Sequence, residues 1–567
     1  MNVDVRCAAA NGLWAASALP ARLALARATR RVGRTQAGVL RGILAANARC
    51  EFGVRHAFSG VRDMEEYRDR VPLSTYEDYR EAVDRIARGE PNVLTGDPVI
   101  RLVPTGGSTS GRKLIPYTRA LRAAMDEAVG AWAADLFARM PRLMGGRAYW
   151  SITPAGPVPD ADPRRDRMPV GFDDDAEYLG AVARRVMPRV LAVPSLVRHV
   201  DDMEAWRYVT VAFLARARSL ALVSVWNPLF LRLLLDALAR DWDRIGDDLS
   251  RGALRPPRPL PPAIAAGLEG LWRADPRRAA EMRRIGAEET QAWRRHARLW
   301  PALRLVSCWA DGHARAPASD LRALLPQACV QGKGLVATEG FVTLPLVGCP
   351  GALLAVRSHV FEFLPRSRTG SASDQGGTAT RLAHELATGE EYSVVLSNGA
   401  GLYRYCLRDV VRVVGHVGEC PLLEFVAKED QVSDRVGEKL DACHVQTRLQ
   451  ESLAAARVVP VFAMVAWEAG ERGAGRYVLF IEAPEACDGL LARVAERLDE
   501  ALRENPQYAY ARDLGQLGPL EAFRVDASAP ADYLAECVAR GQRLGDVKSV
   551  ALHSGTGWAR VFHLGVR

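Results

Sequence analysis

Segments with strand-forming character are concentrated in one part of this chain, from about residue 303 to residue 425. They are rich in β-branched and aromatic residues and are separated by turn signals. The stretches at about 20–95 and 195–300 show helical periodicity instead. This segregation predicts a mixed α/β fold. The strand-like segments are LRLVSCWA, QACVQGKGLVAT, ALLAVRSHVFEFLP, YSVVLSNGAGLYRYCL and DVVRVVGH.

The length of the chain indicates more than one folding unit. At a prior of about 150 residues per domain, the 567 residues allow roughly two to four units. With 49% hydrophobic and 25% charged residues, the composition is that of an ordinary globular protein, which excludes collagenous, coiled-coil and disordered classes. The net charge of +8 is small for this length and is not concentrated in one block. Nucleic acid is therefore not an expected partner.

The sequence offers no candidate for a membrane span. The longest apolar stretch, residues 208–238, is interrupted by three arginines, and no other window has the roughly 18 uncharged apolar residues that a span needs. The N-terminal segment is rich in alanine and arginine without a continuous apolar core, which favours an amphipathic helix over a signal peptide. The cysteines and histidines show no CxxC or HExxH spacing, so neither a disulfide framework nor a zinc site is expected. We expect a cytoplasmic protein.

Lysine is scarce in this chain. The 75 basic residues divide into 70 arginines and five lysines, and an arginine-rich codon bias explains the scarcity but not the positions that remain lysine. Arginine can replace lysine in solvated ion pairs, whereas a compact ammonium fits better against a phosphate or carboxylate oxygen in a narrow site. The remaining lysines are therefore candidates for a functional site, with a random remainder as the alternative for any one of them. They are Lys113, Lys333, Lys428, Lys439 and Lys548.

The loop TGGSTSGRK at residues 105–113 combines three glycines, four hydroxyl groups and two cations. Glycines let the backbone approach an anion closely, hydroxyls and amides donate to its oxygens, and a cation balances its charge, so a phosphate site is predicted. A flexible surface turn is the alternative. The loop is not a Walker P-loop, because Arg112 stands where the motif needs lysine and Leu114 stands where it needs serine or threonine. A short strand precedes the loop, and Thr118 is expected to cap the helix that follows.

Two further segments carry acidic residues beside apolar runs. Thr338 and Glu339 lie in QGKGLVATEGFVTLPL, where a carboxylate could help to hold Mg²⁺ against nucleotide phosphates. Asp409 lies among apolar strand residues of GLYRYCLRDVVRVVGH, and a carboxylate at the end of a strand could accept hydrogen bonds from both ribose hydroxyls. For both carboxylates, an ion pair with a nearby basic residue is the alternative.

The order of these segments is that of adenylate-forming enzymes. A glycine and hydroxyl loop, a Thr-Glu pair, a tyrosine-rich strand with an aspartate, a hinge and a small C-terminal domain with a late lysine follow one another. On this order, and on seven collinear segments, the chain resembles the auxin-responsive acyl-acid amido synthetases, the Gretchen Hagen three family, in a bacterial-type form. Acyl-CoA synthetases, luciferases and peptide-synthetase adenylation domains belong to the same superfamily. The segments are ILAANARCEFGVRHAF, VPLSTYEDY, SVWNPLFLRLLLDAL, LWPALRLVSCWADG, QGKGLVATEG, FEFLP and GLYRYCLRDVVRV.

The resemblance implies an adenylate-forming-enzyme fold. In that fold a large N-terminal adenylation domain, residues 1–427, combines β-sheets flanked by helices with a β-barrel-like part, and it binds the nucleotide and the acyl acid. An acidic hinge at 428–441 connects this domain to a small mobile α+β lid domain at 442–567.

The resemblance also implies roles for individual residues. Family phosphate ligands match Ser108, Thr109, Ser110 and Lys113; the pair that faces adenine and the metal matches Thr338 and Glu339; the ribose ligand matches Asp409. Lys439 corresponds to a lysine that reaches the α-phosphate, and Lys548 to a C-terminal-domain lysine that favours adenylation. Glycines at positions 106 and 107 replace a hydroxyl of the family loop, so one phosphate contact is either lost or made by the backbone.

The implied activity consumes ATP with Mg²⁺. A monomeric enzyme would activate a small-molecule carboxylic acid as acyl-AMP and transfer the acyl group to an amine or amino acid, with the acyl pocket expected in the helical region 120–240. Two other functions stay open: a ligase that transfers the acyl group to coenzyme A or a carrier thiol, and a nucleotide-binding regulator without turnover. A serine hydrolase built on Ser108 or Ser110 is remote, because the loop lacks GxSxG.

Overall fold

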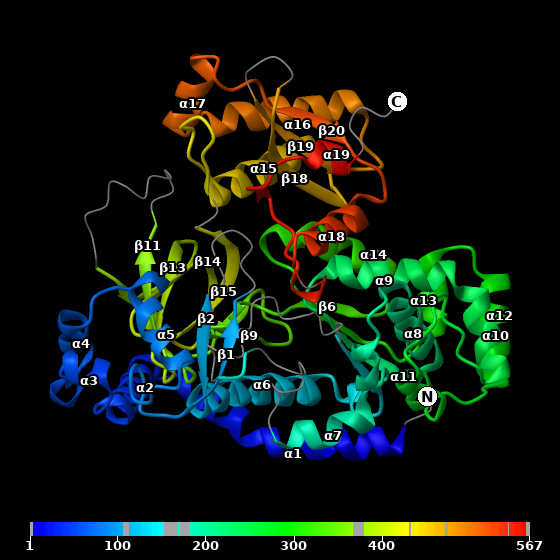
Figure 1. Ribbon diagram of the computed structural model, residues 1–567, viewed down its shortest axis with the longest axis horizontal. Coiled ribbons are helices and arrows are strands. Elements are labelled where there is room, and N and C mark those ends of the chain that lie inside the picture. The colour runs from blue at the N-terminus through cyan, green and yellow to red at the C-terminus, as the bar shows by residue number, and fades with distance from the viewer. Residues whose placement is uncertain are drawn as a thin grey trace.

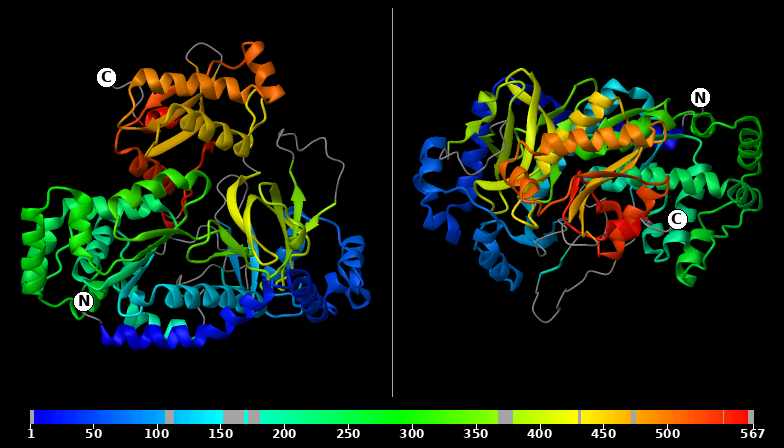
Figure 2. Two further views of the ribbon diagram at one scale, coloured as in Figure 1. Left: turned by 180° about the vertical axis from the view of Figure 1, so that it is seen from behind. Right: turned by 90° about the horizontal axis from the view of Figure 1, so that it is seen from above.

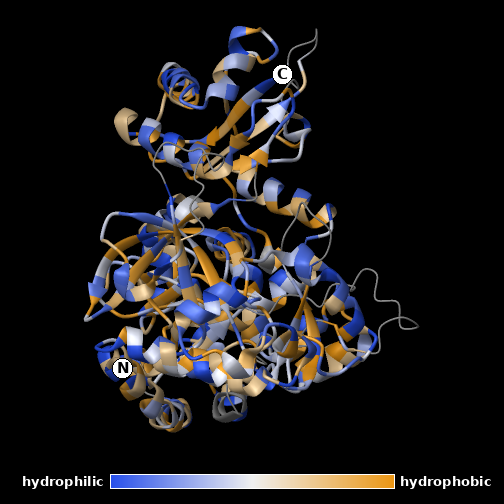
Figure 3. Ribbon diagram, turned by 90° about the vertical axis from the view of Figure 1, so that its left-hand side faces the viewer, coloured by the Kyte–Doolittle hydropathy of each residue, from blue (hydrophilic) through white to orange (hydrophobic). Residues whose placement is uncertain are grey.

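We describe the protein from a computed structural model, which describes residues 4–105, 113–151, 168–170, 181–366, 379–429, 432–470, 475–542 and 544–562. The chain forms two unequal parts (Figure 1). The larger part contains the N-terminus, a parallel sheet and an antiparallel sheet, and the smaller C-terminal part lies above it in this view. The predicted mixed α/β class is confirmed, and Figure 3 shows hydrophobic residues gathered on the strands of both parts.

The first helices lie on the outside of the larger part. The longest of them, α1, packs against α6 and α7 and follows the lower edge of the molecule (Figures 1 and 2). Asp4 caps it by accepting hydrogen bonds from the backbone N–H groups of Arg6 and Cys7. These helices are α1 (Val5–Ala28), α2 (Val32–Asn47), α3 (Glu51–Arg55), α4 (Met64–Arg70) and α5 (Arg80–Ala87).

A hairpin leads into the central helix of the larger part. Strands β1 (Val99–Pro104) and β2 (Leu114–Thr118) pair antiparallel on either side of the loop that the sequence singled out. Helix α6 (Arg119–Arg139) follows at once, and the Thr118 hydroxyl accepts from the Leu121 N–H at 3.2 Å, which confirms the predicted cap. Most of the apolar residues that recur at helical spacing in α6, among them Met125 and Leu136, are buried, and Val129 is partly exposed.

Four strands form a parallel sheet in the order β3-β4-β5-β6, surrounded by helices. Its buried side chains make a core of their own with the helices α8 to α14. The strands are β3 (Arg147–Trp150), β4 (Leu220–Ser224), β5 (Leu305–Cys308) and β6 (Cys329–Gly332). The helices are α7 (Ala181–Val190), α8 (Met203–Arg216), α9 (Pro228–Arg240), α10 (Trp242–Arg251), α11 (Pro262–Glu269), α12 (Pro276–Glu288), α13 (Ala292–Leu299) and α14 (Arg315–Leu324).

Seven strands form an antiparallel sheet in the order β12-β11-β13-β14-β15-β10-β9. This sheet is the barrel-like part, and it is open, since its outer strands β12 and β9 do not pair with each other in the described chain. A small hairpin, β7 (Val336–Ala337) and β8 (Gly340–Phe341), connects the two sheets. The seven strands are β9 (Thr343–Pro345), β10 (Ala352–Leu354), β11 (Val360–Pro365), β12 (Arg381–Leu382), β13 (Glu391–Ser397), β14 (Tyr405–Val417) and β15 (Cys420–Lys428).

The C-terminal part is built on a four-stranded sheet in the order β20-β19-β18-β21. Strand β15 ends at the first residue of the predicted hinge, 428–441, and the hairpin β16–β17 follows within that segment; the movement of this segment stays a prediction. The elements are β16 (Val432–Ser433), β17 (Leu440–Asp441), α15 (Ala442–Ala456), β18 (Phe462–Glu468), β19 (Arg476–Glu482), α16 (Asp488–Leu502), α17 (Pro506–Asp513), β20 (Glu521–Arg524), α18 (Ala529–Ala539), β21 (Leu552–His553) and α19 (Trp558–Val561).

Helix α9 joins the two parts. Leu229, at its start, is buried in the same apolar cluster as Phe462 and Trp558 of the C-terminal part. Beside it, the Asn227 side-chain amide donates to the Val547 carbonyl at 2.8 Å. The C-terminal part is therefore docked on the larger part through a packed contact and a buried hydrogen bond, in addition to the covalent connection.

Candidate active site

The β1–β2 hairpin places Lys113 at the mouth of the glycine-rich loop. The Thr105 N–H donates to the Lys113 carbonyl at 2.9 Å, so the two strands stay paired up to the loop. The next residue, Leu114, donates its N–H to the Tyr76 hydroxyl at 2.9 Å. Both groups belong to the peptide unit that follows Lys113, so the backbone on the C-terminal side of Lys113 is held in place. The predicted phosphate ligands Ser108, Thr109 and Ser110 lie outside the described residues.

Thr338 and Glu339 form the two-residue turn between β7 and β8. His359 is buried beneath this turn, and its Nε2 accepts a hydrogen bond from the Phe341 N–H at 3.1 Å. Burial lowers the pKa of His359 to about 3, so the ring is neutral and can act as an acceptor. A Cβ at Gly340 would lie 2.5 Å from His359 Nε2, which explains why glycine follows the Thr-Glu pair.

The carboxylate of Glu339 lies in a group of charged and hydroxyl side chains. Its Oε1 is 3.4 Å from the Tyr405 hydroxyl. Burial raises the pKa of Glu339 above its ordinary value, and nearby Asp409 adds to the increase, whereas Lys428 and Lys113 oppose it. Lys113 and Asp409, from two segments distant in the sequence, therefore both lie within electrostatic reach of Glu339.

Asp409 is directly opposite Lys428 in the antiparallel sheet. Their positions on β14 and β15 are paired, and Lys428 Nζ lies 3.5 Å from Asp409 Oδ1. The same ammonium donates to the Leu407 carbonyl at 3.1 Å. Asp409 is buried within β14 rather than at its end. Lys428, whose role was open from the sequence, is thus the counter-ion of the predicted ribose ligand.

Aromatic residues follow the ends of three strands of the parallel sheet. Trp150 ends β3, while Trp226 and Trp309 follow β4 and β5; the latter two rings are 5.9 Å apart. Lys333, directly after β6, donates to the Ser224 hydroxyl at 2.7 Å, and its ammonium is 4.9 Å from the Trp226 ring centroid and 5.8 Å from that of Trp150. Carboxyl ends of parallel strands meet at one edge, where open α/β sheets bind ligands.

Lys548 reaches this tryptophan cluster from the C-terminal part. Its Nζ lies 5.6 Å from the centroid of the Trp309 ring, within the range of a cation–π contact. The segment that carries it is held by the bond from Asn227 to the Val547 carbonyl, and by the Tyr533 hydroxyl, which donates to the Lys548 carbonyl at 2.6 Å. Lys548 is therefore positioned at the contact between the two parts.

Lys439 lies outside the group formed by Lys113, Glu339 and Asp409. It occupies the β16–β17 hairpin of the C-terminal part with an exposed side chain and a left-handed backbone (φ 43°). Its carbonyl accepts from the side-chain amide of Asn505, the N-cap of α17, at 3.1 Å. In this orientation of the C-terminal part, Lys439 belongs to that part's own surface, and contact with a phosphate near Lys113 would require a rotation.

The structure thus brings Lys113, Glu339 and Asp409 together, with Thr338 in the same turn, and places Lys548 beside the tryptophan cluster. The sequence did not predict the three tryptophans, although each stands at or directly after a β-branched or apolar run, which is a signal that could have found them.

Within the described chain, no group of three or more His, Cys, Asp or Glu side chains is arranged to hold a metal ion. Likewise, no described helix combines the length and apolar character needed to cross a bilayer.

The fold is that of acyl acid amido synthetases. The solved structure of AtGH3.15 acyl acid amido synthetase in complex with 2,4-DB superposes with a TM-score of 0.80, covering 95% of each chain at 19% identity. Family models for the GH3 N-terminal, central and C-terminal domains match residues 23–330, 352–428 and 423–554. The chain belongs to the GH3 family.

Plant relatives are similar over most of their length. Indole-3-acetic acid-amido synthetase GH3.8 of Oryza sativa subsp. indica is 24% identical over 565 residues, which cover 92% of this chain and 88% of the relative. Jasmonoyl--L-amino acid synthetase GH3.5 of Oryza sativa subsp. japonica is 24% identical over 526 residues, 87% of each chain.

Proposed function

We propose that this chain is an ATP-dependent ligase that activates a carboxylic acid as acyl-AMP and transfers the acyl group to an amino acid or another amine. The observation that carries the proposal is that Lys113 and Asp409, from two distant segments, both lie within electrostatic reach of Glu339. The names of the plant relatives, which are amido synthetases, support the same reaction class. We also propose a monomeric, cytoplasmic enzyme; its ten free cysteines are consistent with a reducing compartment.

The first step makes the acid reactive. A carboxylate resists attack by an amine because its leaving group would be oxide, whereas the mixed anhydride with AMP has a stable leaving group. The acid oxygen attacks the α-phosphorus of ATP, a P–O bond forms, and pyrophosphate leaves. Lys113 would balance the charge on the phosphates, and Asp409 would accept hydrogen bonds from the ribose hydroxyls.

Glu339 fits the requirements of a magnesium ligand. Mg²⁺ in nucleotide sites is usually bound by one or two carboxylates together with substrate phosphates, so a single carboxylate near the phosphate loop suffices. Glu339 is only partly exposed, and its pKa is raised by burial, so a cation would relieve an unfavourable negative charge. The ion would neutralise phosphate charge when bound.

The tryptophan cluster is the proposed site of the acyl group. Trp150 and Trp226 belong to the region 120–240 in which the acyl pocket is expected, and both are partly exposed at the sheet edge. Flat apolar rings favour an apolar or ring-containing acid over a short polar one.

In the second step, an amine attacks the acyl carbon and AMP leaves. Rotation of the C-terminal part about residues 428–441 would bring Lys439 and Lys548 toward the site in turn.

Exchange of labelled pyrophosphate into ATP tests the proposal. We expect exchange that depends on an added acid from a panel of aryl, indolyl and fatty acids, with AMP and an amide released when amino acids are supplied. Exchange followed by a thioester with coenzyme A, and no amide, would assign the thioester ligase instead. ATP binding without exchange against any acid would favour a regulator without turnover.

A further inference from the structure

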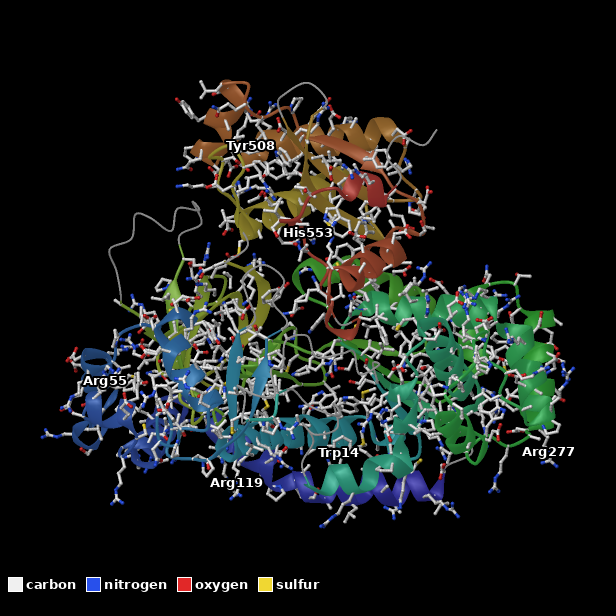
Figure 4. All side chains as sticks on the ribbon, viewed as in Figure 1. Trp14, Arg55, Arg119, Arg277, Tyr508 and His553 are labelled. Carbon is white, nitrogen blue, oxygen red and sulfur yellow. The ribbon has the colours of Figure 1, made fainter. Side chains whose placement is uncertain are left out.

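Helix α1 presents an apolar face to solvent. Its opposite face is packed against α6 and α7 and contains Trp14, labelled in Figure 4. On the outer face, four large apolar side chains are between 46% and 76% exposed: Val5, Leu13, Leu19 and Leu23. The exposed positions between them include alanines and a proline, and the exposed polar residues of the helix are Arg6, Ser17 and Arg27. A solvent-facing helix normally carries charged and polar residues there.

Acidic residues are absent from α1 and from the residues that follow it up to residue 50. Residues 5–50 include eight arginines but neither Asp nor Glu, although the 67 acidic residues of the chain predict roughly five in a stretch of this length. Seven of these arginines are exposed: Arg6, Arg27, Arg30, Arg31, Arg34, Arg41 and Arg49. The eighth, Arg22, lies 3.8 Å from Asp135 of α6. Neighbouring α7 adds exposed Arg185 and Arg189.

Apolar side chains flanked by arginines match the surface of an anionic bilayer. Leucines enter the boundary between headgroups and acyl chains, and guanidinium groups pair with lipid phosphates. A second copy of this chain fits less well, because a face-to-face dimer would bring two sets of arginines together without carboxylates between them. In addition, a large apolar face that is exposed on a monomer usually marks an interaction site.

We propose that the outer face of α1, with the arginines of residues 27–34, docks on an anionic lipid surface. The helix lies at the edge of the larger part that is opposite the C-terminal part (Figures 1 and 2). Docking therefore leaves the contact between the two parts free to open and close. The interaction is peripheral and reversible, because one apolar helix face gives only modest affinity by itself.

Co-sedimentation of the full chain with vesicles tests this proposal. We expect binding to phosphatidylcholine vesicles that contain phosphatidylglycerol, weaker binding at high salt, and little binding to phosphatidylcholine alone. The triple variant Leu13→Ser, Leu19→Ser, Leu23→Ser should bind at least about tenfold more weakly, because it no longer buries the apolar area of three leucine side chains in the bilayer. Leu271→Ser with Leu514→Ser, equally exposed leucines elsewhere, is the matched control and should bind as the wild type does.

A charge series completes the test. Arg30→Gln, Arg31→Gln, Arg34→Gln should reduce binding to the anionic vesicles, whereas the same change at the exposed Arg277, Arg284 and Arg294 should leave it unchanged. Absence of wild-type binding to anionic vesicles overturns the proposal, as does equal binding by the leucine variant. Self-association of the wild type that the leucine variant abolishes would assign the face to a second copy instead. Pyrophosphate exchange is not needed for any of these readings.

Discussion

Lys113 combines a fixed backbone with a compact charge. Hydrogen bonds from the Thr105 N–H and to the Tyr76 hydroxyl hold the peptide unit that follows Lys113, so β2 fixes the point from which its side chain extends. A guanidinium at the same point would be larger and would direct its donors differently. The identity of the cation, and not only its charge, should therefore matter.

We predict that Lys113→Arg lowers the rate of acid-dependent pyrophosphate exchange by at least about tenfold, equivalent to about 1.4 kcal/mol of barrier. Arg119→Lys, the reverse exchange at an exposed position of α6, is the control and should not change the rate. Wild-type exchange kinetics in Lys113→Arg would contradict the assignment of Lys113 to the phosphates.

Asp409 has a structural partner as well as a proposed ligand role. Removing its carboxylate breaks the ion pair with Lys428 across the sheet, so Asp409→Ala should lower the free energy of unfolding by about 1–2 kcal/mol. The double variant Asp409→Ala, Lys428→Met should recover part of that loss, because the ammonium that lost this ion pair is removed as well. If Asp409 binds ribose, the apparent KM for ATP stays raised in both variants. A KM that returns to the wild-type value in the double variant would leave Asp409 only the structural role.

At the scale of elements, the β7–β8 turn depends on a neutral histidine. His359 accepts from the Phe341 N–H only when its Nε2 carries no proton, and burial lowers its pKa to about 3 from the ordinary 6.5. Below 6.5 the unfolded chain takes up a proton that the buried ring does not. The free energy of unfolding should therefore decrease as the pH falls from about 6.5 toward 3, by up to about 4 kcal/mol from this group.

Urea unfolding at a series of pH values measures that contribution. His359→Gln keeps an acceptor but does not titrate, so its free energy of unfolding should fall less steeply than that of the wild type over the same pH range. Parallel curves for the two proteins would show that another group causes the acid sensitivity.

Much of the element structure could be predicted from the sequence, because local signals determine it. The helix cap at Thr118, the buried stripe of α6 and the strand segments after residue 303 all follow from residue type and spacing. The pairing of Asp409 with Lys428 could not be predicted, since it depends on the register of β14 against β15, which includes two irregularities. The tryptophan cluster was missed for a related reason: its members meet only when three strands that are distant in the sequence, β3, β4 and β5, align.

At the scale of the whole molecule, a buried glutamate lies near the contact between the two parts. Glu482 ends β19, and its Oε2 has no hydrogen-bond partner among the described residues. Burial raises its pKa to about 7; Arg232 of α9 opposes the increase, while Asp320, Asp236 and Asp526 add to it. In the docked orientation, the protonated carboxyl group of Glu482 is therefore favoured.

We predict that the docked orientation is stable below the ordinary pKa of about 4.5 and weakens as the pH rises through about 7. Energy transfer between dyes placed on the two parts would report this change as a greater mean separation at pH 8 than at pH 6. Glu482→Gln, which cannot ionise, should hold the separation constant over that range. The same pH response in wild type and variant would remove Glu482 from the explanation.

The place of Lys428 in the chain has a mechanical consequence. It is at once the last residue of β15, the partner of Asp409 and the first residue of the segment that leads to the C-terminal part. A nucleotide sugar that competes for Asp409 would loosen the ammonium at the very point where the backbone leaves the sheet. If Asp409 binds the sugar and residues 428–441 act as the hinge, Lys428 would take part in both, and a bound nucleotide would have a direct means of influencing the rotation of the smaller part.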